Sequence, residues 1–243
     1  FRKWIKGKTL NLKFIIIIVL ISQLPFAVYL LINYDNQENI AETTNFDLDS
    51  SWDIILNDDF NNIDSENYWH MGLLEDPDGD TNLLIEDGKL RFELTNCNSN
   101  KEMVFYRDLE TIGTVDDAYI SLDGESISGN DNRGFGIYFR SKNGSFYYFT
   151  IRDFKRIFSF LIYDDGKWTS ILPDTKSEII NPNSSNELGV SFIGNEIKLY
   201  INDSLVGIVT DSRQLGGNIG LGALLTCPDG SVYEFDNLEL YKP

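Results

Sequence analysis

The chain has 243 residues, with 38 acidic and 20 basic side chains and a formal net charge of −18. A surface this negative repels phosphate backbones, so nucleic acid is excluded as an expected partner, whereas neutral sugars and divalent cations are compatible with it. The single histidine and the absence of any Cys/His cluster in the sequence argue against a zinc or redox site.

The N-terminal part of the chain predicts a membrane anchor. Residues 1–13 contain five cations and no acid, which indicates a basic cytoplasmic segment under the positive-inside rule. Residues 14–33 are almost entirely apolar, and a helix over 14–32 would span roughly 28 Å, close to the hydrocarbon core of a bilayer. The alternatives are a buried core helix and a cleaved signal peptide, but the apolar run is longer than a signal peptide needs and no A-x-A-like site follows it. We therefore expect a single-pass protein of the cell membrane whose C-terminal part is exterior.

Residues 34–51 are acidic and polar, which is typical of a flexible stalk. The exterior domain is predicted over 52–243, where short β-type runs alternate with Asn, Asp and Gly turns. The predicted strands are 53–57, 83–86, 89–95, 102–107, 116–124, 134–141, 145–151, 157–163, 168–172, 187–193, 196–201, 205–210, 218–225 and 231–241. This spacing predicts an all-β antiparallel sandwich, preceded by the one transmembrane α-helix.

Two of these strands, 134–140 and 145–151, are apolar on both faces. In an antiparallel sheet one face normally reaches water and alternates with the buried one. Such strands are therefore either central strands whose outer face is covered, or strands that line a concave surface with aromatic rings.

The two cysteines, Cys97 and Cys227, each end an apolar run and precede turn-forming residues. Outside a membrane a disulfide is permitted, and closing so long a loop would stabilise the fold by up to roughly 4 to 5 kcal/mol in the chain-entropy model. We expect this disulfide. The alternative is a pair of buried free thiols.

Eight motifs follow one another through the exterior domain. They are DDF (58–60), DGKLRFEL (87–94), GFGIYFRS (134–141), FYYF (146–149), DDGKW (164–168), NELGVSFIGNEIKLYIND (186–203), GGNIGLGA (216–223) and YEFDNLELY (233–241). Together they resemble the concanavalin A-like lectin/glucanase superfamily, in particular its family-16-like and laminin G-like jelly-roll domains. The resemblance implies two curved antiparallel sheets packed face to face, with the first and last strands adjacent.

The hydrolases of this family carry an E-x-D-x-x-E run in a central strand, since a retaining glycosidase needs two carboxylates about 5 to 5.5 Å apart. The predicted central strands of this chain, 134–141, 145–151 and 157–163, carry no such run and contain no acid. We therefore expect a non-catalytic module that binds a glycan or a partner protein. The alternatives are an accessory subunit of a membrane complex and a divergent glycoside hydrolase.

The resemblance also implies a structural calcium ion. In the family's glucanases the ligands are a carbonyl near the first strand, the carbonyl of a D-G-K turn and an Asp on the last strand. The matching positions are Asp59, Gly88 and Asp236, and a hard cation held by oxygen alone suits an acidic chain. The alternative is that Asp236 only makes edge hydrogen bonds and that Gly88 only forms a hairpin turn.

Five residues of the predicted central sheet are candidates for a sugar platform: Tyr138, Arg140, Tyr148, Arg152 and Trp168. Aromatic rings stack on the apolar face of a pyranose, and guanidinium groups bond its hydroxyls. Tyr138 and Arg140 are expected to share one face of their strand. For each ring, the alternative is a place in the core.

Three N-glycosylation sequons, at Asn143, Asn183 and Asn202, fall in predicted turns. In a chain so rich in Asn, three is near the number expected by chance, so they carry no functional prediction.

Overall fold

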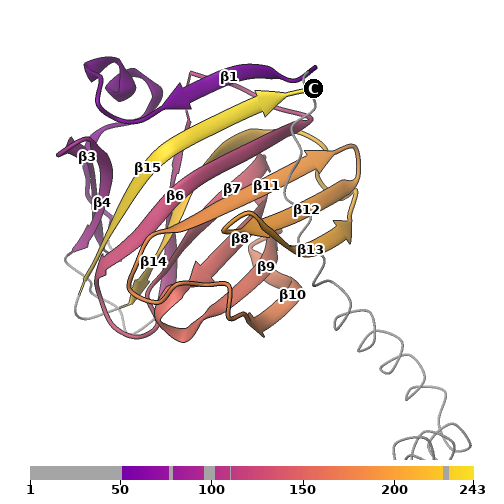
Figure 1. Ribbon diagram of the computed structural model, residues 1–243. Coiled ribbons are helices and arrows are strands. Elements are labelled where there is room, and N and C mark those ends of the chain that lie inside the picture. Colours follow the sequence, from indigo (N-terminus) through magenta and orange to yellow (C-terminus); the bar gives the residue numbers. More distant parts are fainter. Residues whose placement is uncertain (1–50, 77–78, 96–101, 110, 227–229) are drawn as a thin grey trace, which may run out of the picture. The chain divides into compact units, whose positions relative to one another are not determined.

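The structure is a computed structural model, and it describes residues 51–76, 79–95, 102–109, 111–226 and 230–243 (Figure 1). The chain divides into two compact units, Phe1–Glu42 and Thr43–Pro243, and every described residue belongs to the second. Within the described ranges, no helix is long and apolar enough to cross a membrane. The predicted span at 14–33 and the predicted disulfide between Cys97 and Cys227 lie outside the described residues.

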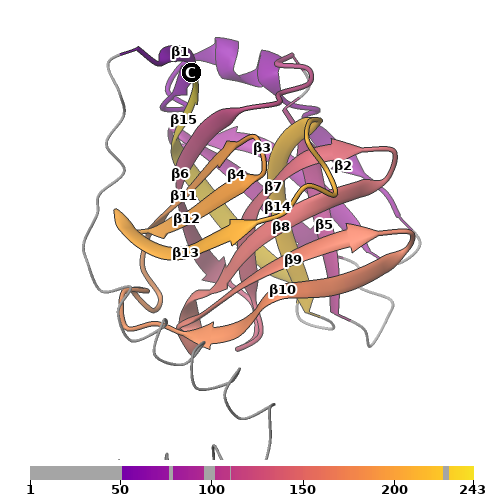
Figure 2. The same cartoon turned by 90° about the vertical axis from the view of Figure 1, so that its right-hand side faces the viewer.

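The second unit is built from two antiparallel sheets that face each other (Figure 2). The nine-stranded sheet contains β13 (Ser204–Thr210), β12 (Glu196–Ile201), β11 (Asn186–Ile193), β6 (Ala118–Ser128), β15 (Ser231–Lys242), β4 (Lys89–Thr95), β3 (Asp80–Glu86) and β2 (Gly72–Leu74) in this order, with β1 (Asp53–Asp58) also paired to β15. The six-stranded sheet contains, in order, β10 (Lys167–Lys176), β9 (Ile157–Asp164), β8 (Ser145–Arg152), β7 (Gly134–Lys142), β14 (Asn218–Thr226) and β5 (Glu102–Asp108). Two short 3-10 helices, η1 (Ile63–Tyr68) and η2 (Asp153–Lys155), lie in connections.

The predicted sandwich of two antiparallel sheets is confirmed, and each predicted strand coincides with an observed one. The prediction missed β2, because three residues are too few to show alternation. It also ended β10 before Pro173, although the strand continues to Lys176. β10 is an edge strand, where proline is tolerated because one side of the strand makes no ladder hydrogen bonds.

The main hydrophobic core lies between the two sheets and takes one face of each strand. In β4 and β6, for example, the alternating residues Leu90, Phe92, Ile120 and Leu122 are at most 1% exposed. In β4 this burial fixes the register, since a slip of the strand by one residue would turn Leu90 and Phe92 toward solvent. Each such side chain contributes roughly 1.5 to 3 kcal/mol through burial.

The strands β7 and β8 are buried on both faces, so of the two alternatives they fit central strands whose outer face is covered. Ile137 and Phe139 belong to the core between the sheets. Tyr138 belongs to a second cluster with Phe146 and Tyr148, on the opposite face of the six-stranded sheet. The rings of Tyr138, Phe146 and Tyr148 thus cover the outer face of the six-stranded sheet.

The first and last strands are adjacent, as the resemblance implied. β1 pairs with the C-terminal half of β15, and Asp53 lies opposite Lys242. β15 in turn pairs with β6 along its other edge, so it is a central strand although it ends the chain (Figure 1).

Candidate functional site

Aromatic side chains cover the outer face of the six-stranded sheet. We call this surface the aromatic face and define it by six residues: Tyr106 (β5), Tyr138 (β7), Phe146 and Tyr148 (β8), Tyr163 (β9) and Trp168 (β10). Phe146 is its centre, with ring centroids at 5.2 Å from Tyr106 and 5.5 Å from Trp168. Phe146 itself is buried, whereas Tyr106 and Trp168 are 46% and 43% exposed. The two accessible rings therefore lie on the two edge strands of the sheet, joined by a buried ring between them.

Glycines in β14 allow the two central tyrosines to lie against the sheet. A Cβ atom at Gly220 would lie 2.5 Å from Tyr138 Oη, and one at Gly222 would lie 2.6 Å from Tyr148 Cε2. Real Cβ atoms do not approach other atoms so closely, so any other residue at these positions would displace the rings. The GxG pattern of β14 is therefore part of what builds the aromatic face.

The hydroxyl of Tyr138 is fixed at one end of this face. It donates a short hydrogen bond to Asp108 Oδ1 on β5. Burial, together with the negative charge of Asp108, raises the pKa of Tyr138, so the phenol stays neutral and serves as a donor.

A polar pair borders the face near β10. Arg152 Nη2 donates to Asp174 Oδ1 at 3.0 Å, and the Ser159 hydroxyl donates to the same oxygen at 2.6 Å. The Arg152 side chain is 23% exposed and that of Asp174 51%. The pair is thus held in place by the sheet and still reaches solvent, as a group that bonds sugar hydroxyls must.

The predicted sugar-platform residues separate into three groups. Trp168 and Arg152 are accessible on or beside the aromatic face. Tyr138 and Tyr148 lie in the face but are at most 1% exposed, so their rings support it from within. Arg140 lies elsewhere.

The prediction that Arg140 shares a strand face with Tyr138 is wrong. The β7–β8 register shifts between Phe139 and Lys142, and Arg140 adopts a φ of +53°. This irregularity turns the Arg140 side chain toward the opposite sheet, where its guanidinium lies 5.0 Å from the ring centroid of Phe192.

Arg140 instead joins three loops at one end of the sandwich. Its side chain is fully buried, and its guanidinium donates to the carbonyl oxygens of Asp116 (3.0 Å), Gly194 (2.7 Å) and Gln214 (3.2 Å). These bonds connect the loops that precede β6, follow β11 and precede β14. The role is structural.

Sequence reasoning missed Tyr106 and Tyr163 as members of the face. Both lie in predicted strands, and Tyr163 has a ring centroid 5.0 Å from that of Trp168. The alternation within each strand could have placed them on a face, but only the strand order shows that β5 and β9 belong to the same sheet as β8.

Two acids that border the aromatic face, Asp108 and Asp174, each accept a hydrogen bond from a neighbouring side chain. Asp164 accepts a hydrogen bond from the Ser145 hydroxyl at 2.6 Å. Asp164 and Ser145 directly follow or precede aromatic-face residues in their strands, so they point away from this face.

A cavity of about 200 Å³ on the nine-stranded sheet was not predicted. It is lined by Ser121 and Asp123 of β6, Glu187 of β11, and Asn237 and Glu239 of β15. The strand register explains why these residues lie together. On one side of β6, Glu187 of β11 pairs with Asp123, and on the other side Glu239 of β15 pairs with Ser121. Three carboxylates from distant parts of the sequence thus meet on one face.

Glu187 is the perturbed member of this group. Burial, followed by the charges of Asp203, Asp123 and Glu239, raises the pKa of Glu187 to about 7. The unfolded chain has a carboxyl pKa of about 4.3, so the folded state binds this proton more tightly than the unfolded state does. The protonation of Glu187 therefore contributes most to the free energy of unfolding below about pH 4.3, the pKa of the unfolded chain. This contribution is lost as the pH rises through about 7, the pKa in the folded state.

The predicted calcium ligands come together through strand register. β15 pairs with β1 at Asp58↔Leu238 and with β4 at Leu90↔Phe235. Asp59 and Gly88, just beyond these pairs, are therefore both brought next to residues 236–237. Among the described residues, no group of three or more His, Cys, Asp or Glu side chains is arranged to hold a metal ion. The predicted set is of another kind, since it has one carboxylate and two main-chain carbonyls.

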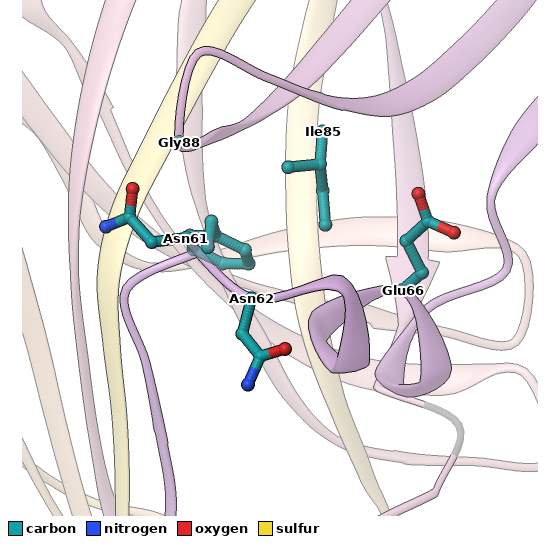
Figure 3. Close-up of a pocket in the computed structure, with 6 residues that line it drawn as sticks. Asn61, Asn62, Glu66, Ile85 and Gly88 are labelled. Atoms are coloured by element: carbon teal, nitrogen blue, oxygen red, sulfur yellow. The ribbon is translucent and has the colours of Figure 1, made fainter.

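Figure 3 shows the Gly88 turn above Asn61, beside a cavity of about 240 Å³. Asn61 Nδ2 donates to the Asp59 carbonyl oxygen at 3.0 Å, and Asn61 Oδ1 would lie 2.4 Å from a Cβ atom at Gly88. Asn61 Oδ1 thus lies close to the Gly88 turn, while the Asp59 carbonyl oxygen accepts a hydrogen bond from Asn61. Carbonyl and carboxylate oxygens are the donors that a hard cation prefers.

The three sequons lie in turns, as predicted, and all three asparagines have positive φ. Asn202 is held by its own side chain, whose Nδ2 donates to the Ile179 carbonyl oxygen at 2.8 Å and to Asn186 Oδ1 at 3.0 Å. The side-chain nitrogen of Asn202 is therefore engaged in hydrogen bonds within the domain.

No protein-family model and no curated protein sequence matches the chain. Solved structures are similar to it. A GlcNAcα1-4Gal-releasing endo-β-galactosidase from Clostridium perfringens has a TM-score of 0.59 at 12% identity, over 80% of this chain and 64% of that one. The laminarinase catalytic domain from Thermotoga maritima has a TM-score of 0.57 at 9% identity, over 79% and 98%.

A galectin-like protein of unknown function from Bacillus subtilis has a TM-score of 0.54 at 11% identity, over 77% of this chain and 94% of that one. At such identities a likeness shows the fold alone. The described domain accordingly shares the fold of these proteins, a sandwich of two antiparallel sheets.

Proposed function

We propose that this protein is a glycan-binding module that holds sugar on its aromatic face and does not catalyse a reaction. The observation that carries the proposal is the pair of half-exposed rings, Tyr106 and Trp168, on opposite edges of a sheet whose centre is a buried ring. Single exposed apolar side chains are common, but exposed rings that join a contiguous aromatic surface are a feature of binding sites.

The chemistry around the rings suits a neutral carbohydrate. Rings stack on the C–H face of a pyranose, and the Arg152–Asp174 pair offers both a donor and an acceptor to its hydroxyls. A net charge of −18 works against anionic polymers. Two of the similar structures bear the names of enzymes that act on glycans, which supports the same ligand class.

Catalysis is not part of the proposal, because the strands that carry the aromatic face have no E-x-D-x-x-E run and the two acids at the face have other partners. Asp108 and Asp174 each accept a hydrogen bond from a neighbouring side chain. A retaining glycosidase needs one carboxylate as a nucleophile and another as an acid, on either side of the scissile bond.

We expect Trp168→Ala to weaken glycan binding roughly 5- to 30-fold, since it removes one stacking partner. The measurement is isothermal titration calorimetry of the 243-residue chain with laminaritetraose, cellotetraose and xylotetraose. Phe154→Ala is the matched control, because Phe154 is also 43% exposed but lies in η2 against Arg133. Equal affinity of the two variants for every bound sugar, or no binding of any of the three by the unsubstituted chain, would count against the proposal.

We also propose that the domain is displayed outside a membrane. The basic segment 1–13, the apolar run 14–33 and the acidic stalk 34–51 would supply an orientation, an anchor and a spacer in this order. An anchored module of this kind would keep glycans or a glycan-bearing partner at the cell surface.

A structural Ca²⁺ at Asp59, Gly88 and Asp236 completes the proposal. The carbonyl oxygens of Asp59 and Gly88 and the Asp236 carboxylate would hold the ion, which would tie the start of the domain to its last strand. Ca²⁺ accepts this all-oxygen donor set, with water filling the remaining positions.

Calcium should therefore raise the melting temperature of the chain relative to a chelator. An ion that binds only the folded state stabilises it by about 2.7 kcal/mol at a hundred times its dissociation constant. Asp236→Asn should abolish this increment, whereas Asp165→Asn, in the β9–β10 turn, should keep it. A melting curve that is the same in calcium and in chelator would rule out the ion.

A further inference from the structure

The two accessible rings of the aromatic face lie close together, although they come from the two edge strands of the sheet. Five strand spacings of about 4.8 Å separate β5 from β10, which is roughly 24 Å along the sheet. The ring centroid of Phe146 nevertheless lies 5.2 Å from that of Tyr106 and 5.5 Å from that of Trp168. The centroids of Tyr106 and Trp168 are therefore no farther apart than the sum of these two distances.

The floor next to the two accessible rings is itself aromatic. Phe146 contacts both of them, and Tyr138 contacts Phe146 and Tyr106 with ring centroids at 5.6 and 5.3 Å. Phe146 and Tyr138 are at most 2% exposed, and the Tyr138 hydroxyl is already bound to Asp108. A ligand that touches both accessible rings must therefore turn C–H groups toward this floor, because a hydroxyl pressed against a ring would lose its hydrogen bond to water.

A β-1,4-linked chain of glucose has the shape that this floor requires. Each glucose carries its hydroxyls around the edge of the ring, so both of its faces present C–H groups. The linkage turns each sugar over relative to the one before it, so the chain is extended and every second sugar presents the same face. The distance between such sugars is the length of a disaccharide, which is close to the upper limit on the spacing of Tyr106 and Trp168. A β-1,3-linked chain of the same sugar curves and does not repeat in this way.

We propose that the aromatic face selects an extended β-1,4-linked glucan, and that Tyr106 and Trp168 stack on two of its sugars that are separated by a third. This inference rests on the proposed function. Both rings are 43% or more exposed, so each is open to a sugar from solvent. Three sugars are needed to reach both rings, whereas a disaccharide reaches only one ring at a time.

Calorimetric titration with cellotetraose and laminaritetraose tests the linkage, because these two sugars differ only in how their glucose units are joined. The unsubstituted chain should bind cellotetraose roughly 10-fold more tightly, since only this sugar stacks on both rings.

Tyr106→Ala tests the bridging of the two rings. It should lower the affinity for cellotetraose roughly 10-fold, but the affinity for cellobiose by no more than about twofold, because the disaccharide still stacks on Trp168. Tyr106→Phe keeps the ring and should keep the affinity for cellotetraose. This second variant preserves the test if Tyr106→Ala fails to fold, since a loss of affinity in Tyr106→Phe at an unchanged melting temperature would contradict stacking by this ring.

Three further outcomes would overturn the inference. If laminaritetraose binds at least as tightly as cellotetraose, the face does not select the extended glucan, and the proposed function still stands. If Tyr106→Ala lowers the affinities for cellotetraose and cellobiose equally, one ligand does not bridge the two rings. If the unsubstituted chain binds none of laminaritetraose, cellotetraose and xylotetraose, the inference falls together with the proposed function.

Discussion

Gly136→Ala should prevent the domain from folding. A Cβ atom at this position would lie 2.0 Å from the Phe149 carbonyl oxygen and 2.7 Å from Thr150 Cα. Both are main-chain atoms of β8, which pairs with β7 on one side and β9 on the other, so they cannot move without breaking a ladder. We expect a loss above about 4 to 5 kcal/mol, which approaches the whole stability of a typical domain.

The measurement is the soluble yield and the thermal unfolding of the variant by circular dichroism. Gly144→Ala is the control, in the turn between the same two strands. A Cβ atom there would meet nothing within 4 Å, so only its φ of +79° opposes the substitution. That strain costs about 1 to 2 kcal/mol. If the Gly136→Ala protein melts within a few degrees of the Gly144→Ala protein, the main chain of β8 can shift enough to accommodate the added methyl group.

Arg140→Met should lower the stability by about 3 to 5 kcal/mol. Methionine fills much of the same volume but leaves the carbonyl oxygens of Asp116, Gly194 and Gln214 without their donor, in a buried place. With about 2 to 4 °C per kcal/mol for a domain of this size, the melting temperature should fall by roughly 10 °C.

Arg213→Met is the matched control. Arg213 pairs with Asp211, but its side chain is 44% exposed, so its loss should cost no more than about 1 kcal/mol. Equal melting temperatures for the two variants would mean that water replaces the buried guanidinium without cost.

Strand positions could be predicted because their information is local. In β4, the sequence alternates residue by residue between buried Leu90, Phe92 and Leu94 and their solvent-facing neighbours. The aromatic runs of β7 and β8 likewise indicated either a covered outer face or a surface lined by rings, and Trp168 lies in contact with these rings. Such patterns depend only on the twofold period of a strand.

Arg140 shows why the site itself was harder to predict. Its place was inferred from Tyr138 by the same period, but a bulge interrupts the period between them, and nothing in GFGIYFRS marks it. The cavity lined by three carboxylates was not predicted from the sequence for another reason. Asp123, Glu187 and Glu239 are far apart in the sequence and meet only through the order of β11, β6 and β15, which no single strand reveals.

The pairing of β1 with β15 has a mechanical consequence. Asp53, where the sandwich begins, lies opposite Lys242, next to the last residue of the chain. A force that pulls these two ends apart would load the hydrogen bonds of this ladder one after another, as in unzipping, and would not shear them together. If the domain is tethered at its N-terminal side and a load is attached at Pro243, β1 is the first strand to peel away, and β15 keeps its pairing with β6.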